Sequence, residues 1–151
     1  MNGKGSLTIE ESVEKTWDGL FNPDILEKCM MGCKKLNLVD QNKYKAVLSI
    51  GIPPVNGKYD ATIEIDEIEK WKTYKLMINA EGSAGTVEAK SLINLVRLDE
   101  LKTALHYDFD AAVGGKVAKF GGPILNGVGK MLLQDFFKKF GRELKKTKTQ
   151  N

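Results

Sequence analysis

Histidine and cysteine are scarce in this sequence, and long apolar runs are missing. Its 151 residues include one histidine and two cysteines, so few side chains are available for a metal centre or a nucleophilic triad. No apolar stretch approaches the roughly 20 residues that span a bilayer, and residues 1–5 lack the apolar region of a secretory signal. We therefore expect an intracellular, cytoplasmic protein in a reducing compartment.

The overall composition is that of an ordinary soluble protein. Hydrophobic residues make up 42% and charged residues 28% of the chain, which is typical of globular domains. With no linker or repeat, we predict a single domain over residues 1–151. The net charge of +3 is unevenly distributed along the chain. Residues 138–151 hold six basic residues and one acidic residue, a basic C-terminal tail of +5, which leaves −2 for the rest.

The longest helical pattern lies between residues 116 and 144. Apolar or small residues recur there at steps of three and four, which places them on one face of a helix. They are Val117, Gly121, Leu125, Val128, Leu132, Phe136 and Phe140. Pro123 interrupts the pattern, so the helix either begins near Gly122 or bends there. The glycines at 121–129 have two interpretations: close packing of helix on sheet, or space for a ligand.

Most of the preceding chain alternates between apolar and polar residues. Two short helices, capped by Ser12 and Asn22, are predicted after a first strand at 6–10. Over residues 34–113 the apolar period is two, which indicates antiparallel strands with one covered face. The phase slips within 92–96, which predicts a bulge. The predicted fold class is α+β, with a curved antiparallel sheet of about seven strands wrapped around the long C-terminal helix.

The sequence contains no catalytic constellation. His106 lies on the polar face of its strand, near Asp108 and Asp110, where a surface histidine is expected rather than a base in a cleft. Cys29 and Cys33 are separated by three residues and have no further ligands nearby. Structural thiols are the favoured interpretation, and a redox or metal role is the alternative. We expect no enzyme activity, metal, cofactor or nucleic-acid partner.

An apolar concave surface is the stronger functional candidate. Small and aromatic residues on the inward strand faces would lie opposite the glycine-rich part of the helix. The predicted cavity is lined by Tyr44, Ala46, Leu48, Tyr59, Ala61, Ile63, Tyr74, Leu76, Ile78, Tyr107, Phe109, Gly121, Ile124, Leu125 and Val128. The tyrosines either supply polar groups to a ligand or belong to the core.

Several segments, in the same order along the chain, resemble the family of the carbon monoxide dehydrogenase G subunit. They are Trp17 with Leu20, Asn22-Pro23 and Leu26; Cys29-Met30-Met31-Gly32-Cys33; Gly51 to Gly57; Leu105 to Asp108; Val113 to Ala118; and Leu132 to Phe140. The sequence departs from the family pattern at Met31, Pro53 and Pro123. The resemblance implies a helix-grip fold, shared with START and Bet v 1-like proteins, in which seven strands grip the C-terminal helix.

The resemblance also implies a function. Members of the family are expected to bind hydrophobic molecules. They help carbon monoxide dehydrogenase or related molybdenum enzymes to mature, reach the membrane or pass electrons to quinone. We therefore hypothesise an accessory protein that binds a lipid or quinone-like molecule between sheet and helix. Two alternatives stay open: a cyclase or hydrolase of the same superfamily acting on a small apolar substrate, and a structural adaptor with a filled core.

The basic tail suggests a membrane contact. On a helical wheel, Phe137 lies about 100° from the apolar stripe, on the side of several lysines. An aromatic ring beside lysines fits the interface of an anionic membrane. Phe137, Lys138, Lys145 and Lys146 are therefore predicted to form a weak, peripheral contact at the inner face of the membrane. The alternative is that Phe137 packs inside the protein and that the segment is a solvated helix end.

Overall fold

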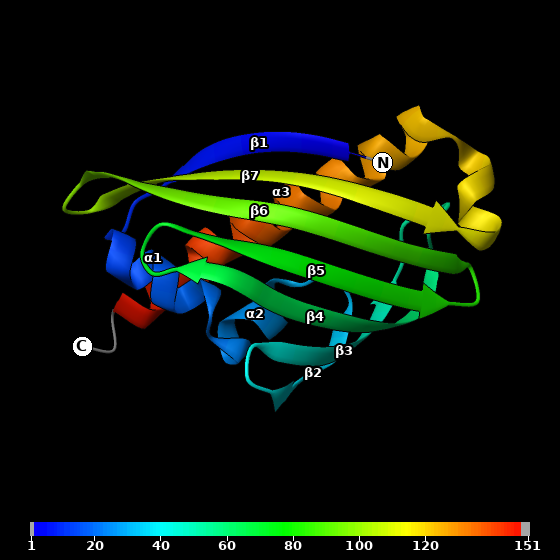
Figure 1. The fold of residues 1–151 in the computed structure, drawn as a ribbon, viewed down its shortest axis with the longest axis horizontal. Helices are drawn as coiled ribbons and strands as arrows, with labels where there is room; N and C mark the ends of the chain where they lie inside the picture. The colour runs from blue at the N-terminus through cyan, green and yellow to red at the C-terminus, as the bar shows by residue number, and fades with distance from the viewer. Residues whose placement is uncertain (1, 149–151) are drawn as a thin grey trace.

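The computed structural model describes residues 2–148, which form one antiparallel sheet of seven strands with helices on one side (Figure 1). The strands are β1 Asn2–Ile9, β2 Cys33–Asp40, β3 Lys43–Ile50, β4 Gly57–Glu69, β5 Thr73–Gly82, β6 Gly85–Asp99 and β7 Lys102–Gly114. Their order in the sheet is β1-β7-β6-β5-β4-β3-β2. Strands β2 to β7 form the predicted meander, and β1 pairs with β7.

Two short helices follow β1, as the capping residues predicted. Helix α1 spans Val13–Leu20, and the Ser12 side chain accepts a hydrogen bond from the Lys15 backbone N–H at 3.1 Å. Helix α2 spans Pro23–Cys29, and Asn22 accepts one from the Asp24 backbone N–H at 2.9 Å. Each cap satisfies an N–H that has no partner within its helix.

The long helical pattern consists of two parts. Gly115–Phe120 forms the short 3₁₀ helix η1, and α3 covers Gly122–Lys148. Between them Gly121 has a φ of 78°, a left-handed conformation that residues with a Cβ rarely adopt. Pro123 therefore stands in the first turn of α3, where its missing N–H breaks no hydrogen bond. Among the helices of residues 2–148, none has both the length and the hydrophobicity of a membrane span.

The period-two pattern correctly identified the inner face of the sheet. One row across the sheet contains Ala46, Ala61, Ala80 and Val87, each opposite the next. The predicted bulge at 92–96 is wrong, because β6 pairs regularly with β7 through Arg97 and with β5 as far as Asn94, and its register with β7 shifts only after Arg97. The alternation looked disturbed because apolar residues, such as the exposed Val96, also stand on the outer face.

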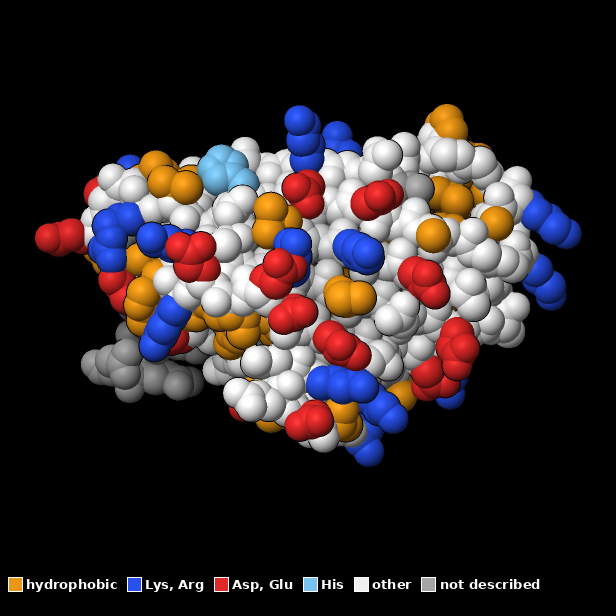
Figure 2. Space-filling view, in the orientation of Figure 1, with side chains coloured by type: hydrophobic (Ala, Val, Ile, Leu, Met, Phe, Trp, Pro, Cys, Tyr) orange, Lys and Arg blue, Asp and Glu red, His pale blue; other side chains and the backbone are white. Residues whose placement is uncertain are grey.

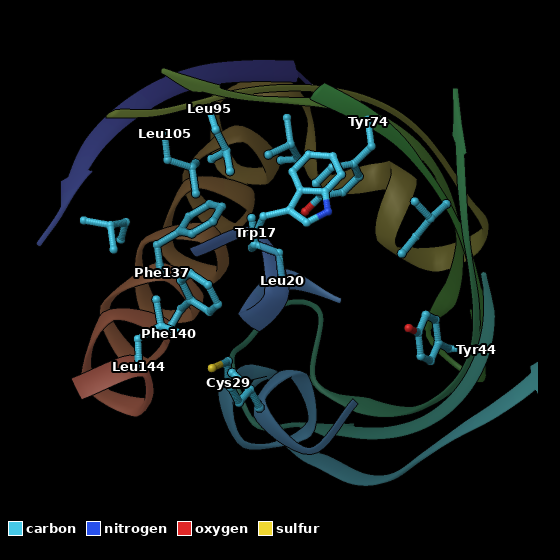
Figure 3. Close-up of a cluster of buried hydrophobic side chains, with 14 of the residues drawn as sticks. Trp17, Leu20, Cys29, Tyr44, Tyr74, Leu95, Leu105, Phe137, Phe140 and Leu144 are labelled. Atoms are coloured by element: carbon cyan, nitrogen blue, oxygen red, sulfur yellow. The ribbon is translucent and has the colours of Figure 1, made fainter. Parts of the chain in front are cut away.

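The hydrophobic core lies at the end of the sheet that carries α1 and α2 (Figure 3). The ring of Trp17, on α1, packs edge-on against Tyr74 of β5 with centroids 5.5 Å apart. From α3, Phe137, Phe140 and Leu144 enter the same cluster, and the last two are almost completely buried. The carboxyl-terminal half of α3 is therefore part of the core.

Candidate ligand-binding site

The inner face of the sheet has two parts that differ in how well they are covered. Near α1 and α2, side chains such as those of Tyr74 and Leu105 are buried in the core. Near η1, a second group of apolar side chains stays partly exposed and lies outside the core cluster. This group, which we call the open end, consists of Ile78, Val87, Ala89, Phe109 and Val113.

The register gathers these side chains into one patch. Ile78 lies opposite Ala89 across β5 and β6, and Val87 lies opposite Val113 across β6 and β7. Apolar side chains packed directly between a helix and a sheet lose almost all contact with solvent. Because the side chains of the open end keep part of that contact, solvent-accessible space lies next to them on the helix side of the sheet.

The first turns of α3 direct some apolar side chains inward and leave others exposed to solvent. Leu125 and Val128 are buried, whereas Ile124, a predicted lining residue, keeps 51% of its surface exposed. A Cβ built on Gly121 or Gly127 would meet no atom within 4 Å. Both glycines are exposed to solvent and therefore do not pack on the sheet, whereas Gly129 is buried. Space for a ligand beside the helix stays a prediction.

Two glycines of β1 shape the wall of the site next to β7. Gly3 lies opposite Phe109, and Gly5 lies opposite Tyr107. A Cβ on Gly3 would lie 2.7 Å from the Phe109 ring, and a Cβ on Gly5 would lie 2.7 Å from Cζ of Tyr107. Each ring thus occupies the space over a glycine. Sequence reasoning missed these glycines because they carry no side chain that marks a face, although their spacing of two was a usable signal.

The four tyrosines on the inner face differ in what they offer a ligand. Tyr74 is buried in the core, and burial raises its pKa. Tyr44 and Tyr59 donate their hydroxyl protons to backbone carbonyls, at 3.4 and 2.6 Å, and burial raises the pKa of both. Tyr107 is only partly buried, and its hydroxyl forms no hydrogen bond with residues 2–148. Tyr107 is therefore best placed to bind a polar group.

Five further predicted lining residues divide between the core and its margin. Ala46 and Ala61 are buried core residues. Leu48, Ile63 and Leu76 are partly buried and pack against the core cluster. Only Ile78 and Phe109 among the predicted strand residues belong to the open end, while Val87, Ala89 and Val113 were not predicted.

Phe137 lies in the core rather than on the surface. Its ring stacks on Tyr107, with centroids 4.9 Å apart, and is only 5% exposed. The prediction that Phe137 contacts a membrane is therefore wrong, and packing inside the protein is the correct alternative. The wheel misplaced it because α3 contacts β1 on one side and α1 and α2 on another, so more than one stripe of the helix is buried.

The basic segment 138–151 continues α3 as far as residue 148, and residues 149–151 lie outside the described part of the chain. The lysines predicted to contact a membrane are exposed; they are Lys138, Lys145 and Lys146. Two of them have carboxylates nearby: Lys145 Nζ lies 3.9 Å from Glu10, and Lys146 Nζ lies 3.0 Å from Glu143. These carboxylates reduce the positive potential at this end of the helix.

The residues with acid–base or thiol chemistry lie away from the open end. His106 is exposed on the outer face of β7, as predicted. Cys29 is buried, and burial raises its pKa to about 11; burial also raises the pKa of Cys33. Both are free thiols that stay protonated at neutral pH, which agrees with a structural role. Within residues 2–148, no three His, Cys, Asp or Glu side chains are grouped to hold a metal ion.

The outer face of the sheet is also hollowed, but several charged side chains border the hollow. A hollow of about 570 Å³ is bordered by Lys35, Lys45, Asp60, Glu81 and Glu88, among others. Figure 2 shows acidic and basic side chains scattered over this face. Covering solvated charges with an apolar molecule is unfavourable, so the open end is the better candidate site.

Solved structures define the fold of the protein. A START superfamily protein from Mycobacterium smegmatis superposes with a TM-score of 0.78 at 11% identity, covering 97% of this chain and 98% of that one. Truncated norcoclaurine synthase from Thalictrum flavum superposes with a TM-score of 0.65 at 12% identity, covering 95% and 92%. Such low identities establish the fold alone, and the chain has the START-like, helix-grip α+β fold.

The particular family follows from the sequence. Residues 5–145 match the model of the carbon monoxide dehydrogenase G subunit (CoxG), and the chain belongs to this family. It is also similar to a conserved protein from Geobacillus kaustophilus of known crystal structure, with 48% identity and a TM-score of 0.94 over 97% of both chains. No curated protein matches the sequence.

Proposed function

We propose that this protein binds an apolar ligand in the open end, between α3 and strands β5 to β7. The supporting observation is the partial exposure of the five apolar side chains on the helix side of the sheet. Complete burial of a Val, Ile or Phe side chain contributes about 1.5–3 kcal/mol. The protein alone does not gain this free energy in full, because the side chains stay partly exposed. A ligand that covers the open end buries them and gains part of it.

The lining favours a molecule that is mostly apolar and has one polar group. Phe109 presents an aromatic ring in the open end, and the hydroxyl of Tyr107, two residues earlier on the same face of β7, forms no hydrogen bond with residues 2–148. Ser91 stands beside Phe109 in the register, but its hydroxyl already donates to the Asp108 carbonyl at 2.6 Å. A lipid chain, or the ring and tail of a quinone, meets these requirements. A charged molecule would lose its hydration without gaining a partner.

Family membership supports an accessory role. The family takes its description from a component of carbon monoxide dehydrogenase. We propose that the protein serves a molybdenum-containing dehydrogenase complex of this type, in maturation, membrane recruitment or quinone coupling. In each case its contribution is to hold or deliver the apolar ligand rather than to catalyse a reaction.

Two other functions have less support. A cyclase or hydrolase needs an acid or base near the reacting atoms, and the five side chains of the open end are all apolar. A structural adaptor with a filled core would bury the same five side chains, which instead remain partly exposed.

Filling the open end tests the proposal. Ala89 faces the helix side of the sheet, whereas Ala112 on β7 points to the outer face and is exposed. We expect Ala89→Phe to weaken binding of a naphthoquinone or a fatty acid by about tenfold or more, equivalent to about 1.4 kcal/mol. The matched variant Ala112→Phe should bind like the wild type.

Native mass spectrometry and fluorescence titration provide the measurement. Equal binding by both variants would place the ligand elsewhere on the protein. Failure of the wild type to bind any of a panel of lipids and quinones would overturn the proposed function.

A further inference from the structure

A second surface borders the open end, on the solvent side of η1 and the first half of α3. Three large apolar side chains are exposed there: Phe120 at 43%, Ile124 at 51% and Met131 at 48%. Ile124 and Met131 are about two helical turns apart and therefore lie on the same side of α3. Exposed apolar side chains gathered in this way indicate a binding surface more often than isolated ones do.

The charged residues of this surface all have the same sign. Lys116, Lys119 and Lys130 are exposed, and residues 111–134 contain no Asp or Glu. None of the three lysines forms an ion pair with another residue in the described part of the chain. In Figure 2 the end of the molecule that carries η1 shows orange and blue side chains, with red ones further in over the strands. We call these six residues the basic apolar surface.

We propose that the basic apolar surface docks the protein on an anionic phospholipid bilayer. The three apolar side chains would enter the interface, and the three lysines would lie among the lipid phosphates, as in other interfacial amphipathic segments. A charge of one sign, unbalanced by carboxylates, complements an anionic membrane. The inference builds on the proposed function, because docking here brings the open end to the layer in which lipids and quinones are dissolved.

The carboxyl-terminal half of α3 does not combine large exposed apolar side chains with lysines that lack ion pairs within residues 2–148. Of its three aromatic residues, Phe137 and Phe140 are buried and Phe136 is partly buried. Lys139 Nζ lies 2.8 Å from Asp135, and Lys145 and Lys146 also have carboxylates nearby. Docking is therefore assigned to the beginning of α3 rather than to its end.

Co-sedimentation of the full chain with vesicles tests how much the three lysines contribute to membrane binding. Vesicles of phosphatidylglycerol and phosphatidylcholine are compared with phosphatidylcholine alone, at low and high salt. Each lysine near an anionic surface strengthens binding about fivefold, so the triple variant K116Q/K119Q/K130Q should bind about a hundredfold more weakly. The matched triple variant K28Q/K34Q/K102Q removes three other exposed lysines and should lose less than about fivefold, because distant charges are screened.

A second pair of variants tests the apolar contribution. Phe120→Ser with Ile124→Ser should lower vesicle binding, whereas Leu98→Ser with Leu101→Ser, at residues that are 54% and 55% exposed in the β6–β7 turn region, should not. Circular dichroism confirms that each variant is folded.

Several outcomes would overturn the docking surface. These are no sedimentation of the wild type with anionic vesicles, equal sedimentation with both vesicle types, equal losses in the two lysine triples, or a loss that follows K145Q/K146Q instead. The Ala89→Phe variant separates this inference from the proposed function: it should lose ligand binding and still sediment. If wild-type protein sediments but binds no ligand, only the proposed function fails.

Discussion

Alanine substitutions at the two β1 glycines should have different effects on stability. Both glycines lie under an aromatic ring of β7, and an added Cβ would come within 3.0 Å of that ring in each case. The rings differ in their surroundings. Tyr107 stacks on the buried Phe137, whereas Phe109 belongs to the open end and lies outside the core cluster.

The magnitudes follow from this difference. Replacing glycine by alanine in a strand stabilises the folded state by about 0.5–1 kcal/mol, because the unfolded chain loses conformational freedom. At Gly5 the Tyr107 ring can move only by disturbing Phe137, and such overpacking costs about 1–3 kcal/mol. At Gly3 the Phe109 ring can turn into the open end for about 0.5–1.5 kcal/mol. We therefore expect Gly5→Ala to destabilise by about 1–2 kcal/mol and Gly3→Ala to be nearly neutral.

Urea unfolding monitored by circular dichroism measures both free energies. Gly3→Ala should also weaken ligand binding, since the displaced Phe109 ring enters the site. Gly5→Ala should mainly lower the free energy of unfolding. Equal destabilisation by the two substitutions, or a larger loss at Gly3, would refute the claim that space exists beside Phe109.

Three further predictions concern the core and the titratable groups. Truncation after Phe137 removes Phe140 and Leu144, which are 0% and 1% exposed. Because losing one buried Phe side chain costs about 3–5 kcal/mol, the truncated chain should show no cooperative thermal transition. Retention of a sharp transition would contradict this. His106→Ala should change stability and ligand affinity by less than about 0.5 kcal/mol, and a larger loss in a binding titration would place His106 in the site. The Cys29 thiol has a pKa of about 11 in the folded protein, against an ordinary 9.0, so the folded state retains a proton that the unfolded chain releases between these values. The resulting stabilisation should be complete below about pH 9 and fall as the pH rises towards 11. Urea unfolding near pH 8 and pH 10 tests the sign, which a gain in stability at the higher pH would contradict.

The sheet was predictable because its pattern depends on local geometry. Side chains of a strand alternate between two faces, so the inward positions of β3, β4, β5 and β7 could be assigned residue by residue. The helix caps at Ser12 and Asn22 were predictable for the same reason, because each depends on residues next to it in the sequence. The bulge was mispredicted because Val96 is apolar yet exposed, and the pattern alone cannot separate a phase slip from an apolar residue on the outer face.

The long helix was predicted less well because its environment changes along its length. Gly121 separates η1 from α3, so the pattern that begins at Val117 spans two elements rather than one continuous helix. The second half then contacts both β1 and the short helices, which buries Phe137 as well as Phe140. Burial on two sides depends on where α1 and α2 pack, and that information lies far from residue 137 in the sequence.

The candidate site was predictable in part. Ile78 and Phe109 were expected to line a cavity, but the buried tyrosines and alanines of the same strands were expected there too. Whether an inward residue belongs to the core or to the open end depends on whether α1, α2 and the second half of α3 pack over it. That coverage follows from the packing of whole elements rather than from the identity of any one strand residue.

Methyl NMR during a ligand titration is the most direct test of the central claim. Ile78 and Met77 are neighbours on β5 with side chains on opposite faces, and Met77 is 39% exposed on the outer face. If an apolar ligand binds in the open end, a naphthoquinone or fatty acid should shift the methyl signals of Ile78, Val87 and Val113 and leave that of Met77 unchanged. Shifts confined to Met77, or none at saturating ligand, would contradict the account.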